Sequence, residues 1–121
     1  MEKKYSSNTQ NQINDILNYL DTWRELFSIK INYYQEGWAI SLREKNLYPR
    51  YIVIFKPYEL NFFSVKSFEI HFNCENKENF KELYFNQNIY NLNELLYEIK
   101  EIIYGKDIAN DLIREFNKKY H

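Results

Sequence analysis

Residues 28–55, SIKINYYQEGWAISLREKNLYPRYIVIF, carry the clearest pattern of secondary structure in the chain. Its segments 28–34 and 38–44 alternate apolar with polar residues on either side of a tight turn, Gln35-Glu36-Gly37. Such alternation is typical of strands with one buried and one open face, so the sequence predicts a β-hairpin here. After a second turn at Pro49, the segment Tyr51–Phe55 is apolar on both faces, which predicts a central strand.

A fourth strand is predicted at residues 68–73, where apolar and polar residues alternate again. We expect one face of the sheet to pack against helices, because alternation leaves a continuous apolar face that must be buried. The residues expected on that face are Ile29, Ile31, Trp38, Ile40, Leu42, Phe68, Ile70 and Phe72.

Helices are predicted on both sides of these strands. Residues 9–27 carry apolar side chains at helical spacing. The C-terminal third has two further apolar stripes separated by Gly105, and the first begins at a capping box of Asn91 and Glu94. In the second stripe, the side chains expected to point inward are Ile108, Leu112, Ile113 and Phe116. A short helix is expected over 76–85, where one helix face would carry Phe80, Leu83 and Tyr84.

The predicted architecture is a single α+β domain over residues 1–121. It consists of a four-stranded, mainly antiparallel sheet with an N-terminal helix and two C-terminal helices packed on one face. Short connections between consecutive strands favour antiparallel neighbours. A mixed sheet and a fifth short strand near 60–65 are the alternatives.

Composition excludes several chemistries. The net charge of −1 lacks the broad basic surface of a dedicated nucleic-acid binder. Two glycines, Gly37 and Gly105, cannot form a glycine-rich phosphate loop. His71 and Cys74 are too few for a structural zinc site, which takes four ligands. We therefore expect no metal, no small-molecule cofactor and no catalytic residues, and a protein that is not an enzyme.

The cysteine count and hydropathy predict where the protein works. The single cysteine, Cys74, rules out an internal disulfide and favours a reducing compartment. The longest apolar run, Tyr51–Phe55, is far shorter than the roughly 20 residues of a membrane span. The expected location is the cytoplasm, of its own cell or of an infected host cell, without membrane contact.

Two surfaces are candidates for binding. If Tyr51, Val53 and Phe55 lie on the open face, that face has an aromatic centre and a polar rim, as interfaces do. The alternative is that the loop 57–67 covers this strand with Tyr58, Phe62 and Phe63. The second surface is the turn 44–50, whose Leu47 and Tyr48 either contact a partner or fold back on the sheet. The candidate partner-binding residues are Tyr34, Arg43, Lys45, Tyr48, Arg50, Tyr51 and His71.

The function expected from these features is that of a non-enzymatic protein-binding domain. Small single domains without catalytic motifs are often inhibitors or neutralisers that cover a partner's functional site, such as immunity proteins or phage-encoded anti-defence proteins including anti-CRISPR proteins. The alternative is binding of RNA or single-stranded nucleic acid, because residues 28–73 carry six basic and four acidic side chains beside stacking aromatics. A homodimer is compatible with either function.

Overall fold

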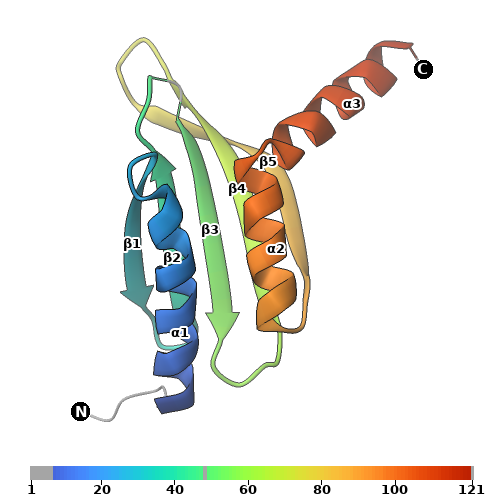
Figure 1. Ribbon diagram of the computed structural model, residues 1–121. Coiled ribbons are helices and arrows are strands. Elements are labelled where there is room, and N and C mark those ends of the chain that lie inside the picture. The colour runs from blue at the N-terminus through green and yellow to red at the C-terminus, as the bar shows by residue number, and fades with distance from the viewer. Residues whose placement is uncertain (1–6, 48, 121) are drawn as a thin grey trace.

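A computed structural model describes residues 7–47 and 49–120 (Figure 1). Its elements in chain order are α1 (Ser7–Leu20), a 3₁₀ turn (Asp21–Trp23), β1 (Phe27–Tyr33), β2 (Gly37–Glu44), β3 (Arg50–Pro57), β4 (Phe63–Phe72), β5 (Glu78–Ile89), α2 (Leu92–Ile103) and α3 (Lys106–Tyr120). The strands form one antiparallel sheet in the order β1-β2-β3-β4-β5. The α+β class, the antiparallel sheet and the order of the helices are confirmed, but the sheet has five strands instead of four.

The extra strand is β5, in place of the short helix predicted over 76–85. Phe68 pairs with Glu82 while its neighbour Ser67 pairs with Tyr84, so Leu83 is an additional residue in β5. Such a β-bulge breaks the period-two alternation and leaves apolar residues three and four positions apart. That spacing is the same as on a helix face, which is why the sequence pattern predicted the wrong element.

The fourth strand also faces the opposite way from the prediction. Tyr51 pairs with Phe68 and Ile52 pairs with Ser67, so Ser67 shares the side of Ile52 and Phe68 lies on the other side. The placement of Phe68, Ile70 and Phe72 against the helices was therefore wrong. The strand begins earlier than predicted, at Phe63, and the buried side chains of its first half fix the phase of the whole strand.

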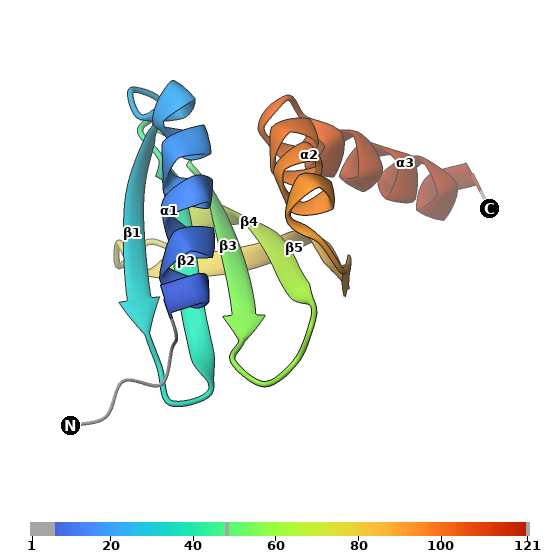
Figure 2. The same ribbon diagram turned by 60° about the horizontal axis from the view of Figure 1, so that its bottom comes forward.

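Both α1 and α2 lie on the same face of the sheet, α1 over β1 and β2 and α2 over β4 (Figures 1 and 2). Between these layers lies the core, whose fully buried side chains include Ile13, Ile16, Leu20, Trp38, Ile40, Leu42, Ile52, Ile54, Val65, Leu95, Ile99 and Ile102. The predicted caps of α2 are confirmed: the side chain of Asn91 accepts a 2.9 Å hydrogen bond from the backbone N–H of Glu94, and Gly105 follows with φ of 106°. The helix predicted over 9–27 ends earlier, and Phe27 already belongs to β1.

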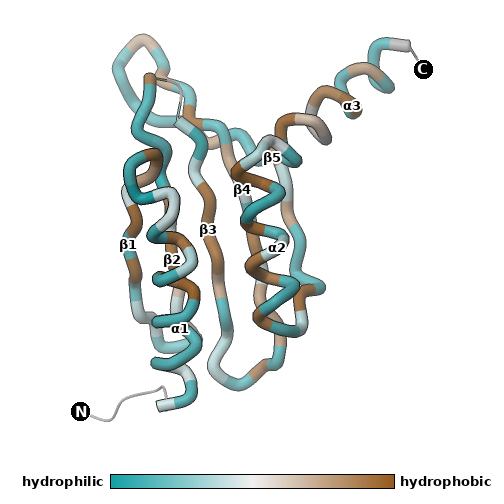
Figure 3. Tube along the Cα trace, in the orientation of Figure 1, coloured by the Kyte–Doolittle hydropathy of each residue, from teal (hydrophilic) through white to brown (hydrophobic). Residues whose placement is uncertain are grey.

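Helix α3 does not join the layer formed by α1 and α2. It projects from the end of the sheet, in contact with β5 and α2 (Figures 1 and 2). The side chains of Ile108, Leu112, Ile113 and Phe116 are 43% to 64% exposed, so the expectation that they point inward was wrong. Figure 3 shows hydrophobic residues recurring along this projecting helix. The covered face of the sheet is already occupied by α1 and α2, which leaves α3 on the outside.

The turn between β1 and β2 depends on Gly37. Gly37 pairs with Pro57, and a Cβ at Gly37 would lie 2.2 Å from the carbonyl oxygen of Lys56. We predict that Gly37→Ala lowers the free energy of unfolding by about 1–3 kcal/mol, because β2 and β3 must separate to admit the methyl group. Urea denaturation beside the exposed control Ser28→Ala measures this effect. Equal unfolding midpoints for the two variants would contradict it.

Candidate interaction surface

Five aromatic side chains gather on the side of the sheet opposite α1 and α2. We call this set, which consists of Tyr51, Phe68, Phe72, Phe80 and Phe85, the aromatic face. The ring centroids of Tyr51 and Phe68 are 6.3 Å apart, those of Tyr51 and Phe80 5.6 Å, and those of Phe68 and Phe80 6.0 Å. These spacings are those of interacting aromatic pairs. Phe80 of this packed set is nevertheless 51% exposed, and Phe72 and Phe85 on the same side of the sheet are 49% and 42% exposed.

The sheet curls to form this surface. Arg43 of β2 and Glu78 of β5 form an ion pair with a nitrogen–oxygen distance of 2.5 Å. In a flat sheet these strands would be about 14 Å apart, because three steps between neighbouring strands separate them. The start of β5 must therefore bend back over the open side of β2, and Figure 2 shows the β4–β5 pair passing behind β1–β3. Ile70, the cross-strand partner of Phe80, is only 1% exposed in this bend.

Charged side chains form the rim of the aromatic face. The hydrogen bond between Arg43 and Glu78 raises the pKa of the Arg43 guanidinium and lowers the pKa of the Glu78 carboxyl. The Lys66 ammonium lies 3.7 Å from the Glu82 carboxylate and 4.9 Å from the centre of the Phe85 ring. The described basic groups next to the exposed rings are thus matched by carboxylates.

The loop after β3 does not cover this surface. Tyr58 packs against the main core and Phe63 belongs to it, so both lie on the side of α1 and α2. The cross-strand partners Ser41–Val53 and Ala39–Phe55 place Val53 and Phe55 on the aromatic side of β3. The sequence allowed two arrangements. The structure has the one in which Tyr51, Val53 and Phe55 lie on the open face of the sheet.

The predicted binding residues do not all come together. Arg43 and Tyr51 are cross-strand partners on the open face. Tyr34 is exposed beyond the end of β1, at the β1–β2 turn. Lys45 donates a 3.1 Å hydrogen bond to the carbonyl of Arg24. His71 lies 2.6 Å from the Glu69 carboxylate, on the opposite face from Tyr51.

The turn 44–50 is only partly available. Leu47 is 77% exposed and does not fold back on the sheet. Tyr48, also predicted to bind, lies outside the described residues. Arg50 is only 8% exposed, so the expectation that it lies on an accessible turn was wrong.

Arg50 is instead the centre of a buried polar network. One terminal nitrogen donates hydrogen bonds to the carbonyl of Ile102 at 2.7 Å and to Asp107 Oδ1 at 3.0 Å, and the other donates to the carbonyl of Ile103 at 3.0 Å. Its Nε lies 3.3 Å from a carboxylate oxygen of Glu44. The guanidinium therefore binds the last carbonyls of α2, which carry the negative end of the helix dipole, and the first turn of α3.

A second polar cluster holds α3 beside β5. The Tyr84 hydroxyl donates to the Glu98 carboxylate, and the Lys106 ammonium donates to the same carboxylate at 3.1 Å. Burial, and next the hydrogen bond with Glu98, raises the pKa of Tyr84. For Lys106, burial acts to lower the pKa, but the hydrogen bond and charge of Glu98 outweigh it and raise the pKa.

Among the side chains that the structure describes, no group of three or more His, Cys, Asp or Glu is placed to hold a metal ion. Cys74 is exposed and unpaired with another cysteine. None of the helices in the described part of the chain is long and apolar enough to span a membrane.

Comparison of the chain with protein-family models, with curated proteins and with solved structures gave no match. The proposed function therefore depends on the geometry of the surface alone.

The burial of Arg50 gives a testable consequence. We predict that Arg50→Gln lowers the free energy of unfolding by about 3–5 kcal/mol, because it leaves the buried Asp107 carboxylate without its cation. The matched control is Arg43→Gln, whose ion pair is about a third exposed and should contribute much less to stability. Chemical denaturation measures both, and a larger loss for Arg43→Gln would contradict the assignment of Arg50.

The second cluster predicts a pH dependence. In the folded state the pKa of Tyr84 lies above its ordinary value of 10.0, so its stabilising effect is complete below pH 10 and is lost as pH rises through the folded pKa. We therefore expect Tyr84→Phe to lose less stability than the parent between about pH 8 and pH 11. Urea denaturation at both pH values measures the difference, and an equal loss in the two proteins would contradict it.

Proposed function

We propose that this protein is a non-enzymatic protein-binding domain and that the aromatic face contacts the partner. The observation that carries the proposal is the exposure of Phe72, Phe80 and Phe85, each near one half, beside packed rings and ion pairs. Aromatic side chains at the centre and charged groups at the rim are the usual anatomy of protein interfaces. Contiguous exposed apolar side chains on a folded domain commonly mark such sites.

The ring contacts of Phe80 favour a rigid binding surface. Phe80 contacts Tyr51 and Phe68, and the Arg43–Glu78 ion pair closes the bend that carries them. Side chains that are already ordered lose little conformational entropy on binding, which favours tight association. We place the protein in the inhibitor or neutraliser class, because a rigid surface of this kind suffices to cover the functional site of a partner. Immunity-type proteins and phage-encoded anti-defence proteins, such as anti-CRISPR proteins, are the members of that class we propose.

The charges favour a protein over a nucleic acid as partner. Arg43 pairs with Glu78, Lys66 pairs with Glu82, and Arg50 is buried. Phosphate binding depends on basic groups that exchange counterions for phosphates, which gives a steep salt dependence. Basic groups already matched by carboxylates are poorly placed for that exchange.

Affinity capture from a lysate of the source cells tests this proposal. We expect the tagged parent protein to retain a stoichiometric protein partner after nuclease treatment. The variant Phe72→Thr/Phe85→Thr should bind at least about 30-fold more weakly, since truncation of an aromatic anchor costs about 2 kcal/mol or more. Its thermal melting should change little, because both side chains are half-exposed and threonine retains β-propensity.

The control is Leu60→Thr, which removes a similarly exposed apolar side chain in the loop between β3 and β4. It should capture the partner as the parent does. Recovery of nucleic acid, or full capture by the double variant, would overturn the proposal.

A further inference from the structure

Helix α3 is a four-turn amphipathic helix with its apolar side exposed to solvent. Its 15 residues span about 22 Å, and an isolated helix of this length is marginal in water. Four of its large apolar side chains are 43% to 64% exposed. Helices in folded proteins draw most of their stability from packing of an apolar face, so burial of this face against another surface would stabilise α3.

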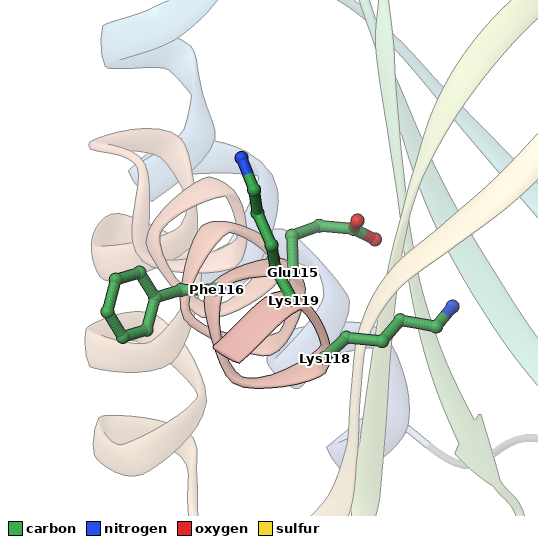
Figure 4. Close-up of a pocket in the computed structure, with 4 residues that line it drawn as sticks. All are labelled: Glu115, Phe116, Lys118 and Lys119. Carbon is green, nitrogen blue, oxygen red and sulfur yellow. The ribbon is translucent and has the colours of Figure 1, made fainter. Parts of the chain in front are cut away.

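Contacts with the domain fix which side of α3 faces outward. Asp107 in its first turn accepts a hydrogen bond from Arg50, and Arg114 donates a 2.5 Å hydrogen bond to the carbonyl of Leu83 in β5. Arg114 is therefore on the side that faces the sheet. Figure 4 shows Phe116 pointing away from the strands, on the opposite side of the helix from Lys118 and Glu115. The described residues that line the hollow at this place all belong to α3, so it is a helix surface rather than a ligand cavity.

Four residues on the outward side of α3 have the spacing found where two helices pair. We call this set the α3 seam, and its members are Gly105, Ala109, Leu112 and Phe116. They follow one another at intervals of four, three and four residues, the spacing at which two helices interlock. Gly105 belongs to the first turn, since its carbonyl accepts a hydrogen bond from the Ala109 N–H. Ile108 and Ile113 widen the seam on its two sides.

The seam is complementary to itself in the antiparallel direction. Two small residues occupy its first half and two large ones its second half. In an antiparallel pair the layers then match Leu112 with Ala109 of the second copy, and Phe116 with Gly105. Each layer joins a large side chain to a small residue, as close packing requires. A Cβ built at Gly105 meets nothing within 4 Å, so there is space for a ring at that position.

A parallel pair fits less well. It would oppose Gly105 to Gly105 and Phe116 to Phe116, so that the first half of the seam would be loosely packed and the second half crowded. Charge also favours the antiparallel direction. The positive N-terminal end of each α3 would lie beside the negative C-terminal end of α3 in the other copy.

We propose that the α3 seam binds a second copy of this chain, as an antiparallel helix pair about a two-fold axis. The seam shares no residue with the aromatic face, so the proposal stands independently of the binding function. A symmetric pair would present two aromatic faces, one from each copy.

Sedimentation equilibrium over a range of protein concentrations tests the pair. The parent should reach twice the mass of the 15.0 kDa chain as concentration rises. Leu112→Glu should remain a folded monomer, with the melting temperature that the parent has at concentrations where the parent is also monomeric, because glutamate is a good helix former and Leu112 is exposed within one copy. The control Leu60→Glu should dimerise like the parent. The proposal would be overturned if the parent stays monomeric, or if Leu112→Glu dimerises as strongly as the parent.

Cross-linking tests the direction and does not depend on Leu112→Glu folding. In a Cys74→Ser background, a short bis-maleimide should join Ala109→Cys to Leu112→Cys in a mixture more efficiently than it joins either variant to itself. Preferential joining of each variant to itself would indicate parallel helices and overturn the antiparallel pair. Equal, weak joining in all mixtures would show that the seam is not the contact.

Discussion

The placement of both C-terminal helices depends on the buried guanidinium of Arg50. A buried charge is costly by several kcal/mol unless partners surround it, and here the partners come from separate elements. They are the carboxylates of Glu44 and Asp107 and the last carbonyls of α2. Because one side chain joins β2, β3, the end of α2 and the start of α3, it fixes where α2 stops and the direction in which α3 leaves. The exposure of the apolar side of α3 follows from that direction.

The end of β2 connects this network to the aromatic face. Arg43 and Glu44 are consecutive residues of a strand, so their side chains point to opposite faces of the sheet. Glu44 binds Arg50 on the covered side, while Arg43 binds Glu78 on the open side. The first contact anchors the helices and the second closes the bend that gathers the phenylalanines. Consecutive residues of β2 thus connect to the two surfaces that we propose for binding, Glu44 to α3 through Arg50 and Arg43 to the aromatic face.

The sequence was sufficient to predict elements that obey one local pattern. The β1–β2 hairpin, the strand at Tyr51–Phe55 and the caps of α2 follow from alternation, apolar runs and capping residues, each of which is a short-range property. Whether Tyr51 shares a face with Arg43 was left open by the sequence, and the register of β2 and β3 shows that it does.

Features that depend on contacts between distant residues could not be predicted in this way. The bulge at Leu83 gave β5 the apolar spacing of a helix. Which side chains of β4 face the helices is fixed by the buried Phe63 and Val65, and these residues precede the segment 68–73 from which the strand was predicted. The burial of Arg50 depends on residues 52 to 57 positions further along the chain. The phenylalanines of the aromatic face were missed for the same reasons, although the alternation of Phe63 and Val65 with Ser64 and Lys66 was a usable signal for their phase.

Hydroxyl-radical footprinting of the free protein and of its captured complex tests the central claim most directly, because it measures the solvent exposure of each aromatic ring. In the free protein Phe72, Phe80 and Phe85 should be oxidised readily, in accord with their exposure near one half. We expect these three rings to become protected in the complex while Tyr97, exposed on α2, stays reactive. Unchanged oxidation of the three phenylalanines in the complex would contradict the assignment of the aromatic face as the binding surface.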